Sequence, residues 1–214
     1  MKTNNYDLIA SWYDCLSRIV FLKSQVNAQN EQLSFIKNHQ KVLIIGGGTG
    51  WILEEIAKTH QNLQITFVEI SANMIALAKQ KKWDKNQVNF VHLPIENFNN
   101  EEFYDVIITA FLFDNFARNR AEIVFENLNH KLKQKGLWLF VDFSNQHIRK
   151  RWQFMFLKIM YFFFKKVARV EAKELVDMYP YFIKNNFAVL QKKHYYGNFI
   201  DAFVFEKNKS PKPC

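Results

Sequence analysis

The chain has 214 residues, of which 49% are hydrophobic and 23% charged, and these proportions are typical of one globular domain with a full core. The formal net charge of +9 and the pI of about 9.4 indicate an anionic partner, either nucleic acid or a membrane surface. Two cysteines exclude a disulfide framework and a cysteine metal site, and the sequence holds no run of 18 apolar residues that would span a membrane. We therefore expect a cytoplasmic protein, since the first residues also lack the apolar core of a signal peptide.

Residues 1–35 are predicted to form a helical cap, because apolar side chains recur every three or four positions from Tyr6 to Leu22. The aliphatic run Val42–Ile45 then predicts a strand buried on both faces. Four glycines follow between positions 46 and 50, and a glycine loop lets the backbone take positive φ and approach a ligand closely. Helical spacing resumes at Ile52, so the loop leads into a helix N-terminus.

The size of Trp51 decides between nucleotide-binding motifs. A dinucleotide fingerprint needs a small residue at this sixth position, and no Lys-Ser/Thr pair follows the loop as a P-loop requires. An ordinary glycine turn between a strand and a helix is the alternative to a ligand loop.

A second motif follows in the run Ile65–Val68, which predicts another strand and ends at Glu69, nineteen positions after Gly50. An acidic residue about 20 positions beyond a glycine loop can accept hydrogen bonds from ribose hydroxyls. Ser71 is the predicted N-cap of the next helix. A solvated Glu at a strand end is the alternative, but the two motifs together favour a nucleoside site.

The Gly46-x-Gly48-x-Gly50 pattern and the later Val-Glu-Ile-Ser-Ala-Asn-Met resemble two motifs of class I S-adenosylmethionine (SAM)-dependent methyltransferases. The resemblance covers about residues 35–206 and implies a doubly wound α/β fold with a mostly parallel seven-stranded sheet. It also implies SAM as the cofactor. The implied cofactor-binding residues are Gly46, Gly47, Gly48, Thr49, Gly50, Glu69, Ile70, Met74, Pro94, Ile95, Thr109 and Phe111. Among small-molecule enzymes, the chain is most similar to C-methyltransferases of ubiquinone and menaquinone biosynthesis.

Three further strands are predicted at residues 88–93, 103–111 and 137–143. The family commonly has an Asp after the first of these strands to bond the adenine amino group, and Pro94 and Ile95 stand there instead. Adenine recognition is therefore left to backbone groups or to Glu96. Residues 118–134 are predicted to be an amphipathic helix that ends near Gly136. Its expected inward residues are Ile123, Val124, Leu128 and Leu132.

The segment 147–169 combines aromatic residues with seven bases and no acid. It is predicted to belong to a lid, residues 145–170, that covers an apolar acceptor and lies against an anionic membrane surface. The alternative is a docked helix whose bases are simply solvated. Residues 171–185 are predicted to be helical, a hairpin is expected at 187–195 and 199–206, and residues 207–214 are predicted to be a disordered tail.

These elements predict a single domain at residues 1–206 that transfers the methyl group of SAM to a small, apolar or aromatic acceptor. Such chemistry needs no metal, and none is expected. If a base is needed, the candidates are Tyr13, Asp114 and His147, each of which has a structural alternative. A nucleic-acid enzyme is disfavoured, because residues 109–116 lack the prolines of base-methylating enzymes. A noncatalytic protein of the same fold that binds a lipid or a partner is the other alternative, and the oligomeric state is open.

Overall fold

The computed structural model describes residues 24–144 and 175–208. Predictions for the remaining residues lie outside the described part of the chain. They concern most of the N-terminal cap with Tyr13, the lid with His147, and the last six residues of the tail.

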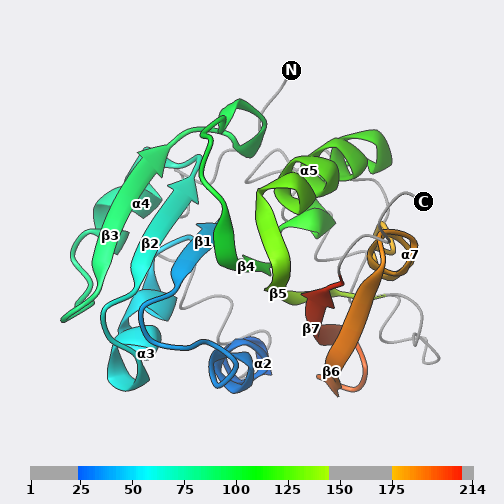
Figure 1. Ribbon diagram of the computed structural model, residues 1–214, viewed down its shortest axis with the longest axis horizontal. Helices are drawn as coiled ribbons and strands as arrows, with labels where there is room; N and C mark the ends of the chain where they lie inside the picture. The colour runs from blue at the N-terminus through cyan, green and yellow to red at the C-terminus, as the bar shows by residue number, and fades with distance from the viewer. Residues whose placement is uncertain (1–23, 145–174, 209–214) are drawn as a thin grey trace.

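One twisted seven-stranded sheet organises the protein, with the strand order β3-β2-β1-β4-β5-β7-β6 (Figure 1). Strands β1 to β5 run parallel through the pairs β1–β2, β2–β3, β1–β4 and β4–β5, and β7 pairs antiparallel with β5 and β6. This confirms the predicted fold class. The strands are β1 (Lys41–Ile45), β2 (Gln64–Glu69), β3 (Gln87–His92), β4 (Tyr104–Ala110), β5 (Leu132–Phe143), β6 (Phe187–Tyr195) and β7 (Ile200–Lys207).

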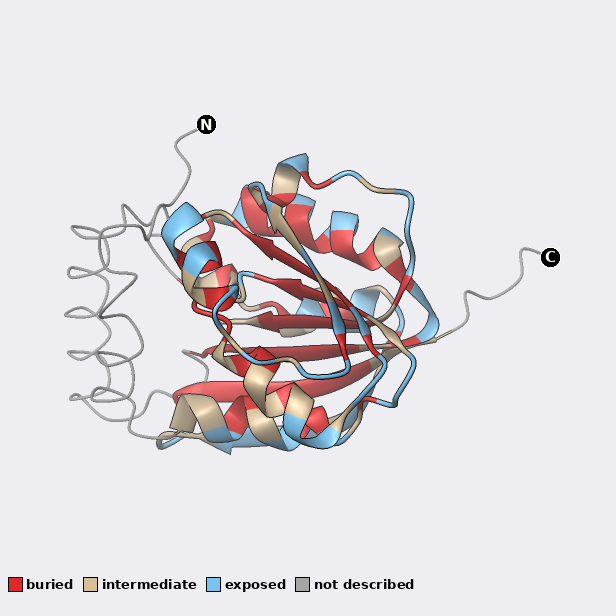
Figure 2. Cartoon of the chain, turned by 90° about the vertical axis from the view of Figure 1, so that its left-hand side faces the viewer, coloured by how far each residue is buried: buried red, intermediate tan, exposed pale blue. Residues whose placement is uncertain are grey.

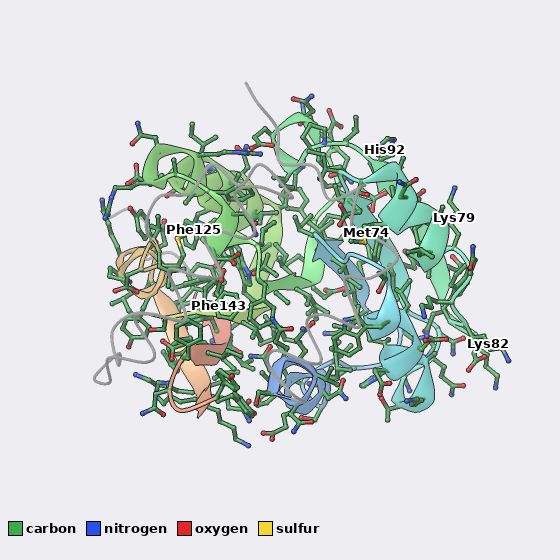
Figure 3. All side chains as sticks on the ribbon, turned by 180° about the vertical axis from the view of Figure 1, so that it is seen from behind. Met74, Lys79, Lys82, His92, Phe125 and Phe143 are labelled. Carbon is green, nitrogen blue, oxygen red and sulfur yellow. The ribbon has the colours of Figure 1, made fainter. Side chains whose placement is uncertain are left out.

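Helices cover both faces of the sheet, and Figure 2 shows their exposed outer surfaces around the buried strands. On one face, α5 (Arg118–Lys131) and α7 (Tyr179–Lys184) share a core with β4 and β5. On the other face lie α2 (Ser24–Leu33), α3 (Trp51–Thr59) and α4 (Ala72–Ala78). Figure 3 shows Lys79 and Lys82 pointing outward near α4, while Met74 on that helix is buried.

Aromatic packing accounts for many of the phenylalanines. The rings of Phe182 and Phe205 stack with their centroids 3.9 Å apart, and Trp138 stacks on Phe125 at 5.2 Å. Trp138 is fully buried and donates its Nε1–H to Thr109 Oγ1 at 2.9 Å. Such ring pairs stabilise a core beyond the area that they bury.

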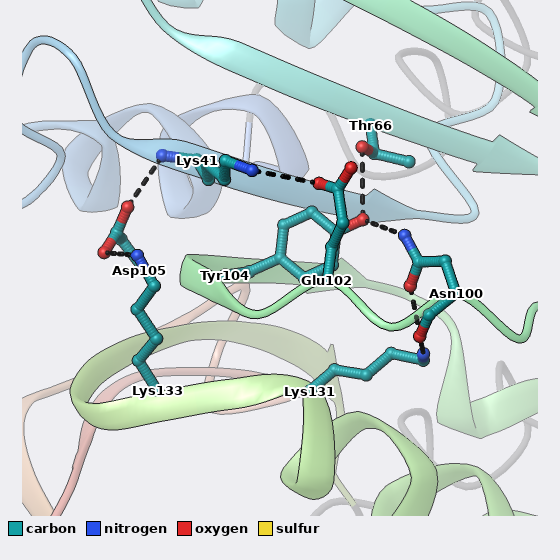
Figure 4. Close-up of polar contacts among 8 residues, drawn as sticks. All are labelled: Lys41, Thr66, Asn100, Glu102, Tyr104, Asp105, Lys131 and Lys133. Carbon is teal, nitrogen blue, oxygen red and sulfur yellow. Dashed lines mark hydrogen bonds and ion pairs between the residues drawn. The ribbon is translucent and has the colours of Figure 1, made fainter.

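Polar contacts hold the amino ends of the strands together (Figure 4). Asp105 accepts a hydrogen bond from the backbone N–H of Lys41 at 2.8 Å and pairs with Lys133 at 2.7 Å, so it joins β4 to β1 and β5. The Tyr104 hydroxyl donates to Thr66 at 3.2 Å and accepts from Asn100 at 2.7 Å. The carboxyl ends of the strands are left for the loops that form a site.

Three predictions about the elements were wrong in detail. Helix α5 ends at Lys131, because β5 begins at Leu132 and runs through Gly136, and Ile123 is 56% exposed while the neighbouring Phe125 is buried. In the predicted helix 171–185, residues 175–178 are not helical, and α7 begins only at Tyr179. Strand β7 reaches Lys207, one residue into the predicted tail. No helix within the described ranges is long and apolar enough to span a membrane.

Candidate functional site

The glycine loop joins β1 to α3, and its conformation depends on two positions. Gly48 has φ 57°, a value that residues with a Cβ rarely adopt, and a Cβ there would face open space. Gly47 packs so closely on the ring of Phe67 that a Cβ would lie 2.2 Å from it. The loop therefore offers backbone groups to a ligand without side chains in the way.

Glu69 ties this loop to the start of α4. Its side chain is buried, at 7% exposure, where β2 ends. Oε2 accepts the backbone N–H of Gly48 at 3.0 Å, and Oε1 accepts that of Ser71 at 2.9 Å. Ser71 in turn caps α4 by accepting the N–H of Met74, as predicted. These bonds fix the carboxylate beside the glycine loop.

A cavity opens at the carboxyl ends of β1, β2 and β4, and with its mouth it encloses about 1340 Å³ of space. All of the predicted cofactor-binding residues except Gly50 and Thr109 line it. Gly50 instead caps α3 and packs against Ala78, while Thr109 is buried and bonded to Trp138. These two predicted cofactor-binding residues are therefore buried away from the cavity wall.

Helix α2 forms a wall of the cavity that the sequence motifs did not indicate. Gln25, Val26 and Gln29 line the cavity from this helix. Gln32, only 1% exposed, anchors α2 by donating its amide to the carbonyl oxygens of Phe140 at 3.1 Å and Phe203 at 3.0 Å. The helix is thus fixed to β5 and β7 at the edge of the site.

The loop after β4 also lines the cavity and holds a strained residue. Phe111 lines the cavity with φ 52°, which is unfavourable for a bulky side chain. Its N–H donates to Val141 at 2.8 Å, and its carbonyl accepts from Asn115 Nδ2 at 2.9 Å. The surrounding bonds therefore hold this backbone in a costly conformation at the site.

The carboxylates of Asp114 and Asp142 lie close together next to the loop after β4. Asp142, 4% exposed at the end of β5, accepts the backbone N–H groups of Phe113 at 2.9 Å and Phe143 at 2.8 Å. Burial, and then the charge of Asp114, raise the pKa of Asp142 well above its ordinary value. Burial raises the pKa of Asp114 to about 7. Asp114 is not among the residues that line the cavity, so the structure does not place this candidate base at a ligand.

At a further part of the wall, Arg120 lines the cavity from the first turn of α5 and is 6% exposed. Its Nε–H donates to Glu96 Oε1, and its guanidinium carbon lies 4.4 Å from the centroid of the Phe116 ring. Among the described residues, Glu69 and Arg120 are the only charged side chains that line the cavity. No group of three metal-ligating side chains occurs in the described part of the chain.

Comparisons with known proteins agree with this geometry. Residues 43–138 match the family model described as a methyltransferase domain. The chain is 31% identical over 142 residues to a malonyl-[acyl-carrier protein] O-methyltransferase of Bacillus cytotoxicus, covering 66% of this chain and 47% of that protein. It is 33% identical over 146 residues to the enzyme of the same name from Priestia megaterium, covering 67% and 50%. The chain thus spans about half the length of these curated relatives.

A solved structure described as a DhpI–SAH complex (SAH, S-adenosylhomocysteine) has the same fold. Its TM-score is 0.69 at 17% identity, and the match covers 96% of this chain and 94% of that one. The more specific resemblance to quinone C-methyltransferases stays a prediction. By sequence, residues 43–138 match a methyltransferase domain, and the described chain has the fold of that SAH-bound structure.

Proposed function

We propose that the protein binds SAM in this cavity and transfers its methyl group to a small-molecule acceptor. The observation that carries the proposal is Glu69, a buried carboxylate fixed beside an open glycine loop at the carboxyl end of the sheet. Ligands of open α/β sheets bind at this end, and an acidic residue after the second strand can bind ribose hydroxyls.

The residues of the cavity fit a nucleoside cofactor. Each carboxylate oxygen has two acceptor positions, so Glu69 can accept ribose hydroxyls in addition to the backbone N–H groups of Gly48 and Ser71. Ile70, Met74 and Ile95 supply an apolar wall for a flat ring. When bound, SAM supplies a methyl group made electrophilic by its sulfonium sulfur.

The protein's own residues would orient the two ligands and exclude water from them. Helix α2 and the Phe111 loop both line the cavity, and both are fixed to the sheet by hydrogen bonds.

The acceptor class is part of the proposal. The mostly apolar wall supports a small apolar or aromatic acceptor, whereas the two relatives are named for malonyl-[acyl-carrier protein]. A general base among Tyr13, Asp114 and His147 also stays a prediction. Asp114 is the one that lies in the described residues, and replacing it by Asn should abolish transfer but spare cofactor binding if it is the base.

Calorimetric titration with SAM, SAH and NAD tests the first step. We expect micromolar binding of SAM or SAH and negligible binding of NAD, since Trp51 stands where a dinucleotide loop needs a small residue. A preference for NAD would refute the proposal. Release of SAH in the presence of malonyl thioesters or of quinone-like phenols then tests the acceptor, and binding without release by any acceptor favours the noncatalytic alternative.

A further inference from the structure

Two glutamine side chains line the cavity from α2, one helical turn apart. Gln29 is 8% exposed, and its Nε2–H donates to the backbone carbonyl of Gln25 at 3.3 Å, which fixes the amide. Within the described residues the Oε1 of Gln29 has no hydrogen-bond partner, and this atom is not sealed from solvent. Gln25 is half-buried, and its amide makes no hydrogen bond in the part of the chain that the structure describes. Both carboxamides are therefore available to a ligand in the cavity.

The α2 wall lies over a different part of the sheet from Glu69. Strands β1 and β4 separate β2, which ends at Glu69, from β5, to which Gln32 anchors α2. Three strand spacings make the separation of β2 and β5 about 14 Å. Ala28 of α2 is buried in a cluster against which Phe111 packs, so the wall adjoins the loop after β4. A ribose at Glu69 would therefore leave the part of the cavity next to α2 for another ligand group, and this placement rests on the proposed function.

The side chains of the α2 wall are uncharged. The residues that α2 contributes to the cavity are Gln25, Val26 and Gln29. The acid of the same helix, Glu31, does not line the cavity and pairs with Lys193. A carboxylate placed against this wall would lose water and gain no opposite charge from α2, which is costly. A neutral hydroxyl or carbonyl needs only hydrogen bonds, and the two carboxamides can supply them.

We propose that the carboxamides of Gln25 and Gln29 position the methyl acceptor through hydrogen bonds to a neutral hydroxyl or carbonyl group. A carboxamide both donates and accepts, so the pair suits a phenol, which does both through one oxygen, and a ketone, which accepts. Val26 and Phe111 also line the cavity and would contact the apolar part of the same molecule. The acceptor is thus an uncharged compound, and anionic acceptors such as malonyl thioesters are expected to bind poorly.

The test measures the binding of 1-naphthol and 1-naphthoate, which share a ring system but differ in charge, to the protein saturated with SAH. We expect fluorescence titration at neutral pH to show about tenfold tighter binding of 1-naphthol or more, because the carboxylate is left unpaired. Gln25→Met and Gln29→Met keep an unbranched side chain without the amide and should each weaken 1-naphthol binding about two- to tenfold. Asn27→Met is the matched control, since Asn27 is an exposed amide on the same helix outside the cavity wall. The affinity for SAH should not change in any of the three variants.

The affinity for SAH separates acceptor recognition from the other roles of the two side chains. If Gln25→Met and Gln29→Met weaken SAH as much as 1-naphthol, the carboxamides serve the cofactor or the fold, and the inference is overturned. It is also overturned if the SAH-loaded wild type binds neither naphthalene compound, or binds 1-naphthoate as tightly as 1-naphthol. If Gln29→Met does not fold, Gln25→Met decides, because position 25 is half-buried and carries no side-chain hydrogen bond within the described residues. Failure of the wild type to bind SAH refutes the proposed function itself.

Discussion

The carboxylate pair behind the Phe111 loop predicts a pH-dependent stability that one substitution should remove. Asp114 and Asp142 lie close enough for the charge of one to raise the pKa of the other. Asp142 accepts two backbone N–H groups, so replacing it would also release the loop. Asp114 accepts from the Asn115 side chain at 2.7 Å, and an asparagine oxygen can keep that bond. Asp114→Asn is therefore the cleaner perturbation.

The direction and the size of the pH effect on the free energy of unfolding follow from the pKa of Asp114, which burial raises from 3.8 to about 7. An acid whose pKa is higher in the folded state binds its proton more tightly there. Its contribution to stability is complete below about pH 4 and is lost as the pH rises to about 7. The difference of about three pH units corresponds to an upper limit of about 4 kcal/mol, at roughly 1.36 kcal/mol for each.

Urea unfolding of the wild type and of Asp114→Asn between pH 4 and pH 8.5 tests this reasoning. The two proteins should have similar free energies of unfolding at pH 4, and the variant should be more stable at pH 8 by up to about 4 kcal/mol. Asp201 is the cross-strand neighbour of Asp142 and pairs with His194 at 2.6 Å, but both groups are present in both proteins and cancel in the difference. Asp84→Asn, at an exposed carboxylate, is the control. A difference that does not change with pH would refute the argument.

Three further predictions concern the ligand site and the segment outside the described residues. Glu69→Ala should weaken SAH binding about ten- to a hundredfold in calorimetry, because the charge-assisted hydrogen bonds from the ribose hydroxyls to the carboxylate are lost. Unchanged affinity would mean that Glu69 only anchors the glycine loop. Gly47→Ala should lower the melting temperature more than Gly48→Ala. A Cβ at position 47 would lie 2.2 Å from the Phe67 ring, whereas a Cβ at position 48 would meet no atom and the variant would have only backbone strain of about 1 kcal/mol. If residues 147–169 contact anionic lipid, cosedimentation with anionic vesicles should exceed that with neutral vesicles and fall when the three bases at 149–151 become Gln. Retention on DNA or RNA without vesicle binding would contradict that expectation.

The parts of the fold that the sequence predicted well are those with strong local signals. Val42–Ile45 is aliphatic throughout because β1 is buried between two neighbouring strands. The spacing between the glycines and Glu69 is typical of a nucleoside-binding site. Helix α5 was harder, since residues 123, 124 and 125 are all apolar and periodicity alone did not decide which of them face the core. The structure buries Val124 and Phe125 and exposes Ile123.

The parts of the site that the sequence missed depend on contacts between distant segments. Arg120 is a single basic residue at the start of a helix, and no sequence pattern indicates that it lines the cavity or bonds Glu96, 24 residues earlier. Asp114 and Asp142 lie close together because β4 and β5 are neighbours in the sheet, and this strand pairing cannot be predicted from a local sequence pattern. Gln32 likewise becomes informative only once α2 is seen against β5 and β7.

The anchoring of α2 also constrains the order in which the protein can assemble. Gln32 bonds a carbonyl oxygen 171 residues later in the chain, on a strand that enters the sheet between β5 and β6. During synthesis the helix emerges early, but this attachment has to wait until β7 has been made and paired. Contacts of such long sequence separation form late and slow folding. A nascent chain that stops before Ile200 should therefore hold the glycine loop and Glu69 but attach α2 through the bond to Phe140 alone, and the α2 wall should be fully fixed only when the last strand is in place.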